Sequence, residues 1–337
     1  MQIYFFTGAA GYIGSHTAYY FLKNSDCRIV IFDNLSSGFK ENIDFLERTF
    51  PQRIEFIQGD LEDLDSLDKA LSAYPYDAII HFAASLIVQE SVQNPLKYFK
   101  NNVANTINLL QIAQKFAINR FLFSSTAAVY GEPKEYSPIQ ESTIPNPINP
   151  YGESKLMIEK ILRALEVANP NFKSVILRYF NVAGALMEQQ GALGQRGKMA
   201  THLIKVACEC ACGKRETMQI FGEDYETQDG TCIRDYIHID DLASAHFFAL
   251  QSLLETQTSE VYNVGYAQGF SVKEVIDCVK KVSGKNFIVE SAPRRRGDPS
   301  ILVSDNHKIL TNTQWKPQFN NIETICKSAY LWETSLE

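Results

Sequence analysis

The stretch "NPYGESK" contains residue types that could move a proton, namely Tyr151 and Lys155. They are four residues apart, so on a helix they would lie on one face. Chance alone supplies this spacing about once in a chain with so many tyrosines and lysines. The sequence indeed holds two further pairs, Tyr19–Lys23 and Tyr130–Lys134. The spacing is therefore informative only together with its context.

That context is a predicted strand end followed by a predicted helix start. "RFLFSST" has the short, apolar pattern of a buried strand and leads to Thr126. Asn149 is a favourable helix N-cap, and Pro150 suits the first helical position. Ligands bind beyond the carboxyl ends of the strands in an open parallel sheet, so Thr126 and Tyr151 should meet there. The other two pairs lie in a first helix and in a proline-containing loop, which offer no such site.

Strands and helices alternate through residues 1–180. Short apolar runs such as "IYFFTG", "RIVIFD", "DAIIHFAA" and "KSVILRYFN" are separated by helix-length amphipathic stretches. This rhythm predicts an α/β fold of the Rossmann type, a doubly wound parallel sheet with helices on both faces. Beyond Asn181 the rhythm breaks, and "MQIFGEDYETQDGT" indicates a hairpin-like region. We expect a smaller mixed α/β substrate region over 181–337, with about 230–265 returning to the first domain.

A glycine-rich turn joins the first strand to the first helix in "FFTGAAGYIGSH". Gly8, Gly11 and Gly14 would allow a tight turn, close approach to a pyrophosphate and close helix–strand packing. The helix N-terminus would then offer free N–H groups to the phosphates. Asp33 ends the second strand at about the interval expected of a ribose-binding acid. A carboxylate there would repel a 2′-phosphate, so the pattern predicts NAD rather than NADP.

Bound NAD would complete an acid–base device around Tyr151. A free phenol has a pKa near 10, and lowering it to about 7 requires roughly 4 kcal/mol of preferential stabilisation of the phenolate. The Lys155 ammonium, the helix N-terminus and a positively charged nicotinamide ring could together supply this stabilisation. Thr126 could hold a substrate hydroxyl and share its proton.

Composition excludes several other classes of protein. The chain has 337 residues, of which 45% are hydrophobic, and a net charge of −7, which argues against nucleic-acid binding. We find neither a signal-peptide pattern nor an apolar run long enough to span a membrane. The cysteines in "CECAC", Cys208, Cys210 and Cys212, have no nearby partners at zinc-finger spacing. We therefore expect a cytoplasmic protein with reduced thiols and no metal.

The combination of motifs resembles the extended short-chain dehydrogenase/reductase family, and within it the UDP-glucose (UDP-galactose) 4-epimerases. The resemblance rests on "TGAAGYIGSH", "HFAA", "SSTAAVYG", "YGESK", "LRYFNVAG" and "DGTCIRDYIHIDDLA", and it runs nearly end to end. It implies tightly held NAD and a transient oxidation at C4 of a UDP-sugar. Tyr151 would remove the O4 proton, and the 4-keto sugar would turn over and regain its hydride on the other face.

The resemblance also implies which residues contact the ligands. Those expected at NAD are Gly8, Gly11, Tyr12, Ile13, Gly14, Asp33, Asn34, Leu35, Ser36, Ser37, Gly38, Asp60, Leu61, Phe82, Ala83, Ala84, Asn101, Ser124, Tyr151, Lys155 and Phe180. Those expected at the UDP-sugar are Thr126, Tyr151, Asn181, Leu203, Phe221, Arg234, Arg295, Asp298 and Leu302. Phe221 would stack on uracil, and the two arginines would neutralise the diphosphate. "PRRRGD" offers three arginines, so the choice of Arg295 depends on the register.

Two further expectations concern the assembly and the sugar. The resemblance implies a homodimer through helices near 95–117 and 150–168. Leu302, in "PSILVSD", occupies the position where glucose-restricted members carry a bulky tyrosine. A smaller side chain leaves room for an N-acetyl group, so interconversion of UDP-GlcNAc and UDP-GalNAc, alone or beside that of UDP-glucose, remains open.

Two other functions fit parts of the pattern. A sugar-nucleotide 4,6-dehydratase needs an acid beside the catalytic Thr126, but Ala127 and Ala128 follow it and cannot donate a proton. A non-catalytic NAD-sensing regulator would keep the glycine turn but would not require Thr126, Tyr151 and Lys155 together. The whole set of residues favours the epimerase.

Overall fold

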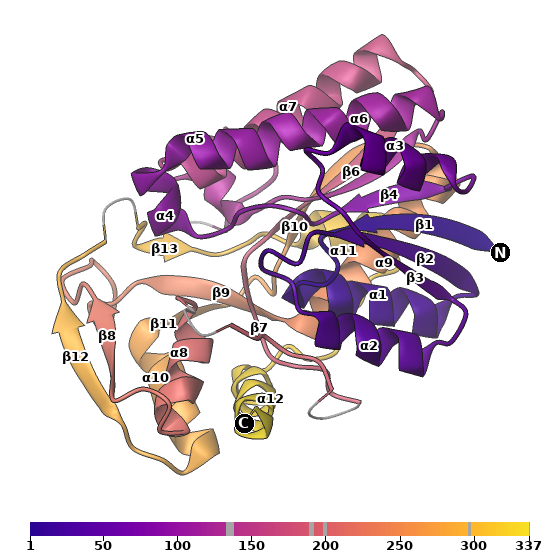
Figure 1. Cartoon of the computed structure of the whole chain (residues 1–337). Coiled ribbons are helices and arrows are strands. Elements are labelled where there is room, and N and C mark those ends of the chain that lie inside the picture. Colours follow the sequence, from indigo (N-terminus) through magenta and orange to yellow (C-terminus); the bar gives the residue numbers. More distant parts are fainter. Residues whose placement is uncertain (133–137, 189–191, 198–200, 296–297, 337) are drawn as a thin grey trace.

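The computed structural model describes residues 1–132, 138–188, 192–197, 201–295 and 298–336. Its centre is a seven-stranded sheet in the order β3–β2–β1–β4–β5–β6–β10, and every neighbouring pair is parallel. The strands are β1 (Gln2–Thr7), β2 (Cys27–Asp33), β3 (Ile54–Gln58), β4 (Ala78–His81), β5 (Arg120–Ser124), β6 (Lys173–Tyr179) and β10 (Glu260–Val264). This confirms the predicted doubly wound α/β fold (Figure 1). The strand order reverses between β1 and β4, where such sheets bind ligands.

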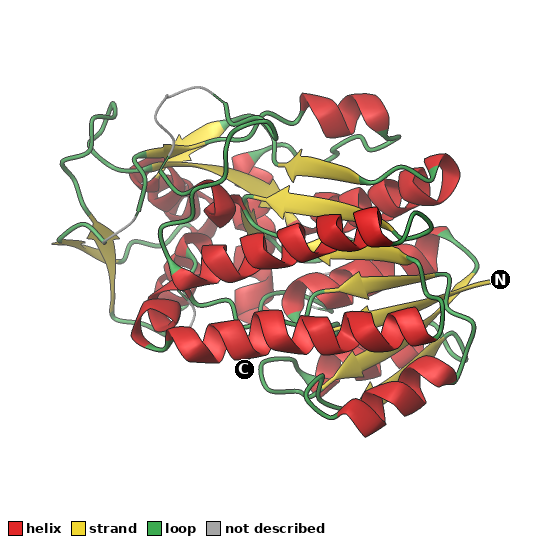
Figure 2. Cartoon of the chain, turned by 90° about the horizontal axis from the view of Figure 1, so that it is seen from above, coloured by secondary structure: helices red, strands yellow, loops and turns green. Residues whose placement is uncertain are grey.

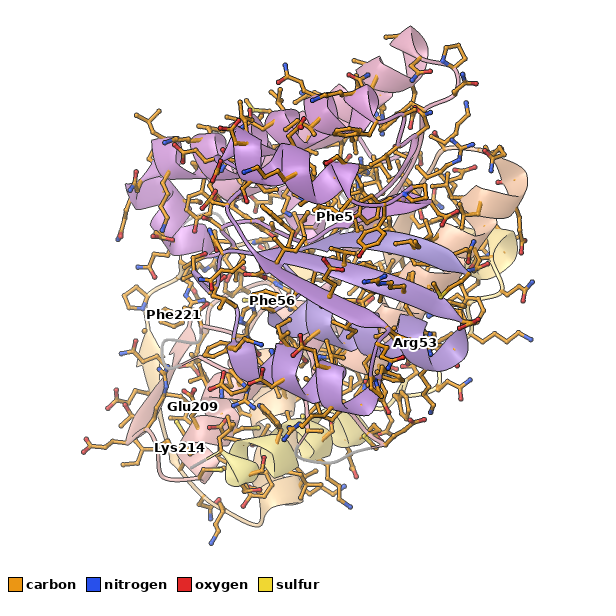
Figure 3. The ribbon with its side chains drawn as sticks, turned by 45° about the vertical axis from the view of Figure 1, so that its right-hand side comes forward. Phe5, Arg53, Phe56, Glu209, Lys214 and Phe221 are labelled. Atoms are coloured by element: carbon orange, nitrogen blue, oxygen red, sulfur yellow. The ribbon has the colours of Figure 1, made fainter. Side chains whose placement is uncertain are left out.

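Helices cover both faces of the sheet (Figures 1 and 2). One face carries α1 (Tyr12–Asn24), α2 (Lys40–Thr49) and α9 (Ile239–Thr256), and the other carries α3 (Leu64–Ser72), α6 (Asn105–Lys115) and α7 (Pro150–Ala168). Strand β1 shows how the sequence builds both cores, because successive side chains point to opposite faces. Tyr4 and Phe6 pack edge-on against Phe21 of α1, whereas Phe5 points to the opposite layer (Figure 3).

The connections at the carboxyl edge of the sheet are short helices and turns. After β4 the chain forms α4 (Val88–Gln93), α5 (Pro95–Tyr98) and a π-helical turn, η1 (Phe99–Ala104), before α6. After β5 it forms a 3₁₀ turn, η2 (Ala127–Tyr130). These segments bring the residues that follow β4 and β5 towards the start of α7, which packs against α4, α5, η1 and η2.

A second lobe lies beyond this edge, at the lower left of Figure 1. Its central strand β9 (Ile233–His238) pairs with β7 (Asn181–Ala183), β11 (Gly269–Ser271) and β13 (Ile301–Leu302). Separately, β8 (Thr217–Phe221) pairs in parallel with β12 (Ile288–Ala292). The hairpin-like interpretation of "MQIFGEDYETQDGT" is therefore wrong, because the partner of β8 comes from much later in the chain. The helices of this lobe are α8 (Leu203–Ala211), α10 (Val272–Ser283) and α12 (Ile322–Ser335), whereas α11 (His307–Asn312) packs against β10 of the central sheet.

The cysteines and the helices have ordinary surroundings. All seven cysteines are free thiols, and Cys208, Cys210 and Cys212 lie on α8 or at its C-terminal cap. Within the described ranges, no group of three or more histidine, cysteine, aspartate or glutamate side chains is placed to hold a metal ion. No helix in the described part of the chain is both long and apolar enough to cross a bilayer.

Candidate active site

The glycine turn after β1 leaves no room for side chains. Gly8 has φ +73°, and a Cβ built there would lie 2.5 Å from the backbone N of Ala83, which follows β4. A Cβ on Gly14 would lie 2.6 Å from the Cα of Ala9, so glycine lets the start of α1 approach the turn closely. Gly11 is the N-cap of α1 and has no side chain to cover the first amides of the helix. The turn thus fits a pyrophosphate bound at a helix N-terminus.

Asp33 lies beside this turn, at the end of β2. Its Oδ2 accepts a hydrogen bond from Ala10 N at 3.0 Å, and its Oδ1 accepts one from Leu35 N at 2.8 Å. Burial raises the pKa of the Asp33 carboxyl, and these two N–H groups act in the opposite direction. Asn34, the next residue, donates to Asp60 Oδ2 at 2.7 Å, which links the ends of β2 and β3. The arrangement can hold a ribose.

The other residues expected at NAD follow the ends of neighbouring strands. They are Tyr12 and Ile13 in α1, Leu35, Ser36, Ser37 and Gly38 after β2, Leu61 after β3, Phe82, Ala83 and Ala84 after β4, Asn101 in η1, Ser124 ending β5, and Phe180 after β6. Since all these strands are parallel, the sheet brings the set to one edge. Tyr12 turns its hydroxyl towards Gly184 O at 2.7 Å, so its backbone rather than its ring is available to a phosphate.

The predicted acid–base residues meet at the same edge. Helix α7 begins at Pro150 as predicted, and the Asn149 side chain caps it by accepting from Gly152 N at 2.9 Å. Tyr151 and Thr126 are each 9% exposed, and Lys155 is 3% exposed. Lys155 Nζ donates to the carbonyl of Ser124 at 2.8 Å. The structure therefore buries the three residues in one place.

Burial shifts the pKa values of this pair in opposite directions. It raises the pKa of the Tyr151 phenol, which a hydrogen bond with Thr126 partly offsets. It lowers the pKa of Lys155 to about 7, which the charge of Glu159 partly offsets. The protein groups alone therefore keep Tyr151 neutral, and the lower pKa that proton removal requires depends on a further positive charge beside the phenol.

The other two Tyr–Lys spacings have different roles. Lys23 forms an ion pair with Glu188, well exposed on the surface. The Tyr130 hydroxyl donates to Asn263 Oδ1 at 2.7 Å and accepts from Arg178 Nη1 at 2.9 Å, so it is part of a buried network. Lys134 lies outside the described residues. Among the described members of these pairs, Lys23 is held at the surface and Tyr130 belongs to this buried network.

The residues expected at the nucleotide lie in the second lobe. Phe221 ends β8, as labelled in Figure 3, and the guanidinium carbon of Arg295 lies 3.8 Å from the centre of its ring. Arg234 forms a salt bridge with Asp298 and donates to Pro299 O at 2.5 Å. Arg294 instead pairs with Asp224 at 2.7 Å, and the third arginine of "PRRRGD" lies outside the described residues, so Arg295 stays a prediction.

The remaining sugar-site candidates are Asn181, Leu203 and Leu302. Asn181 begins β7, and Leu203 begins α8. Leu302, in β13, packs against the apolar cluster that contains Leu156 of α7 and Phe180. Leu302 thus connects β13 of the second lobe to a cluster that includes a residue of α7, the helix that carries Tyr151.

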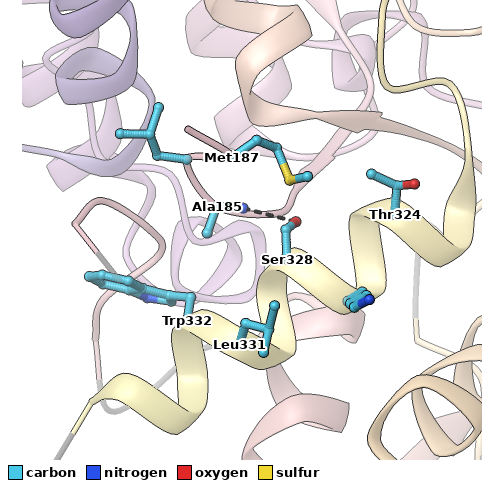
Figure 4. Close-up of a pocket in the computed structure, with 8 residues that line it drawn as sticks. Ala185, Met187, Thr324, Ser328, Leu331 and Trp332 are labelled. Atoms are coloured by element: carbon cyan, nitrogen blue, oxygen red, sulfur yellow. Dashed lines mark hydrogen bonds between the residues drawn. The ribbon is translucent and has the colours of Figure 1, made fainter. Parts of the chain in front are cut away.

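A cavity of about 220 Å³ lies elsewhere, under α12 (Figure 4). Its lining includes Met187, Leu331 and Trp332, and Ala185 N donates to Ser328 Oγ at 3.2 Å beside it. None of the residues expected at NAD or at the sugar lines it. We assign it no part in the reaction.

Sequence reasoning missed three buried polar residues behind the pair, Ser125, Glu159 and Arg178. Two signals could have found them. Glu159 continues the four-residue spacing of Tyr151 and Lys155, and Arg178 is a charged residue inside an otherwise apolar predicted strand.

A glycine turn, a strand-end carboxylate and a buried Tyr–Lys pair on a doubly wound sheet define a dinucleotide-binding enzyme of the reductase type. Family comparison agrees, because residues 4–265 match the NAD dependent epimerase/dehydratase family, and the chain belongs to it. The chain is 46% identical to the UDP-glucose 4-epimerase of Azospirillum brasilense over 331 residues, which cover 98% of this chain and 92% of that protein.

Solved structures give the same result. The UDP-Glc/GlcNAc 4-epimerase of Campylobacter jejuni is 53% identical and covers 99% of both chains, with a TM-score of 0.86. The UDP-glucose 4-epimerase of Bifidobacterium longum, solved in complex with NAD+ and UDP, is 34% identical over 99% of both chains, with a TM-score of 0.92.

Proposed function

We propose that this chain is an NAD-dependent 4-epimerase that interconverts UDP-glucose and UDP-galactose. The observation that carries the proposal is the burial of Thr126, Tyr151 and Lys155 at the carboxyl edge of the sheet, between the glycine turn and the second lobe. Similarity over nearly the full length to UDP-glucose 4-epimerases supports it.

The residues of the cofactor site fit tightly held NAD, which would accept the C4 hydride of the sugar and return it. The Gly8 cradle has no room for a Cβ, and the Asp33 carboxylate lies beside it. Exposed amides at the start of α1 suit a pyrophosphate. Because the hydride is returned, the reaction has no net redox change and requires no exchange of the cofactor.

The chain's own residues manage the proton and the substrate. Thr126 orients the O4 hydroxyl, and the Tyr151 oxygen takes its proton and later gives it back. The Lys155 ammonium stabilises the phenolate. Arg234 and Arg295 hold the diphosphate by charge-assisted hydrogen bonds, so that the sugar can turn over while its nucleotide stays bound. Phe221 offers its ring to uracil.

A second substrate pair is favoured by a specific residue, Leu302. Its side chain packs against the cluster that contains Phe180 and is smaller than a tyrosine, which leaves more room for an N-acetyl group at C2. The similar Campylobacter jejuni protein carries a name that includes both UDP-Glc and UDP-GlcNAc. We therefore propose dual specificity, with UDP-GlcNAc and UDP-GalNAc as additional substrates.

Product analysis with UDP-glucose, UDP-galactose, UDP-GlcNAc and UDP-GalNAc, without added NAD, tests these proposals. Interconversion within each C4 pair is the expected result. A 4-keto-6-deoxy product would identify a dehydratase instead, and no turnover of any of the four would refute the epimerase. Turnover of the first pair alone would eliminate dual specificity.

We also propose a homodimer and a cytoplasmic location. Segment 95–104 packs against α7 on the outside of the molecule, and this layer exposes Leu96, Ile107 and Val167. Sedimentation of the purified protein at several concentrations tests the dimer. The seven free thiols fit a reducing compartment.

A further inference from the structure

A buried ion pair lies directly behind the acid–base residues. Glu159 Oε1 accepts from Ser125 Oγ at 2.6 Å and from Arg178 Nε at 3.0 Å, and its Oε2 accepts from Arg178 Nη2 at 2.5 Å. Both side chains are 1% exposed or less. Burying two charges is expensive even when they are paired, and an apolar pair of similar volume is often as stable. Packing alone therefore does not explain the pair.

Glu159 is connected to Lys155 and Tyr151 through one tripeptide, residues 124–126. Tyr151, Lys155 and Glu159 follow one another at four-residue spacing on one face of α7. Ser125, which donates to Glu159, lies between Ser124 and Thr126 in the chain. The carbonyl of Ser124 accepts from Lys155 Nζ at 2.8 Å, and the side chain of Thr126 acts on Tyr151 by lowering the pKa of its phenol.

The other side of the tripeptide is fixed as well. Ser125 N donates to the carbonyl of Leu177 at 2.8 Å, and Arg178 is the next residue of β6. The carboxylate of Glu159 thus closes a loop of contacts that runs from α7 to β6 and back to the segment after β5. A displacement of the Glu159 carboxylate would therefore move Ser125, and with it the neighbouring residues that face Lys155 and Tyr151.

We propose that Glu159 and Arg178 are positioning residues for proton transfer, a charge-balanced pair that holds Ser124–Thr126 in place and sets the electrostatic surroundings of Lys155. The inference rests on the proposed epimerase function and deepens it. Neither residue touches the substrate or NAD in this assignment; both act through the tripeptide and through their charges.

Few other charges reach Lys155. The remaining titratable groups near the pair are His81 of β4, Tyr98 of α5, Tyr179 of β6 and His246 of α9. Burial lowers the pKa of His81 to about 3 and that of His246 to about 4, and it raises the pKa of both phenols. These four groups are uncharged near neutral pH. Among the described residues, the charge that acts on Lys155 is that of Glu159, and Arg178 is the direct ion-pair partner of Glu159.

Opposite substitutions in the pair should therefore shift the pH dependence in opposite directions. Glu159→Gln leaves the guanidinium of Arg178 uncompensated, which disfavours protonation of Lys155 and Tyr151 alike, so both limbs of the kcat–pH profile should move to lower pH. Arg178→Met leaves the carboxylate uncompensated, so both limbs should move to higher pH. Each shift should be about one pH unit, as expected of a nearby buried charge. The double variant should restore the native limbs.

Two further variants separate positioning from charge and from general damage. Ser125→Ala keeps both charges and removes only the link to Glu159, so kcat should fall severalfold with KM and the pH limbs unchanged. Glu166→Gln is the matched control, because Glu166 also lies on α7 and also accepts from a serine hydroxyl, Ser174 Oγ of β6 at 2.6 Å, but about three turns beyond Lys155. It should leave the kcat–pH profile unchanged.

The outcomes are distinct. Turnover by the native chain is measured first, and its absence counts against the proposed function rather than against this inference. With turnover present, equal or same-direction shifts in Glu159→Gln and Arg178→Met would reduce the pair to a structural role and overturn the proposal. If the charge variants do not fold or do not retain NAD, Ser125→Ala decides the question, and an unchanged kcat would overturn the proposal.

Discussion

Replacing Gly8 by alanine should cost the chain its NAD and part of its stability, and Gly213 offers a matched control. The two glycines have nearly the same φ, +73° and +74°, in the positive range that L-residues rarely adopt. An L-residue in this left-handed region is destabilised by about 1–2 kcal/mol. Both substitutions should lower the free energy of unfolding by at least this amount, and only their surroundings differ.

The surroundings determine the difference. At Gly8 a Cβ would lie 2.5 Å from Ala83 N and 2.6 Å from Ala83 Cα, whereas at Gly213 nothing lies within 4 Å. Ordinary contacts begin at 3.4 Å, so the backbone at the ends of β1 and β4 would have to separate by 3.4 − 2.5 = 0.9 Å. Overpacking of this kind costs about 1–3 kcal/mol. Gly8→Ala should therefore lose about 2–5 kcal/mol in total, given the additional left-handed strain.

Urea unfolding of both variants and the NAD content of the purified proteins measure these effects. Ala83 lies in the loop expected to contact NAD, so its displacement should also remove cofactor from Gly8→Ala but not from Gly213→Ala. Equal destabilisation of the two variants, with NAD fully retained in both, would show that the turn accommodates a Cβ. The steric account of the cradle would then be wrong.

Three other substitutions give separate tests. Tyr151→Phe should lower kcat by about 10²–10⁴-fold, as expected for loss of a general base, while NAD content stays native; unchanged turnover would refute the assigned base. Leu302→Tyr should lower kcat/KM for UDP-GlcNAc by about tenfold or more, as overpacking at the gate implies, with a smaller effect on UDP-glucose. Burial raises the pKa of Asp240 from 3.8 to about 7, so the folded chain keeps a proton that the unfolded chain releases, and stability is lost as pH rises from about 4 to 7. Asp240→Asn should therefore unfold at higher urea than the native chain at pH 8, by a few kcal/mol at most, and the difference should shrink at pH 5.

Much of the fold and part of the site could be predicted because their signals are local. The glycine turn, Asp33 and the Asn149–Pro150 helix start each depend on a few neighbouring residues. Their placement at one edge then follows from the parallel sheet, since parallel strands all end on the same side. The predicted helix start at Pro150 and the parallel sheet are both present in the structure.

The rest depends on pairing between segments that are distant in sequence. The pairing of β8 could not be predicted, because its parallel partner, β12, lies far along the chain. Parallel strands are not joined by a tight turn, so no turn residues mark the pair in the sequence. The salt bridge of Arg234 with Asp298 and the stacking of Arg295 on Phe221 arise in the same way. Composition and spacing can nominate such residues, but only the folded chain shows what each one contacts.

Those contacts also distinguish buried charges that influence the reaction from buried charges that only join parts of the fold. Lys205 of α8 and Glu333 of α12 form another nearly buried ion pair, and Lys214 adds a second cation to Glu333 at 2.9 Å. This pair fastens α12 to α8, and within the described part of the chain none of its contacts leads to the carboxyl edge. Glu159 is equally buried, but its Ser125 contact leads within one residue to the partners of Lys155 and Tyr151. Burial alone therefore does not mark a functional charge; continuity of contacts with the reacting groups does, and this is why Glu159 rather than Glu333 should control the pH dependence.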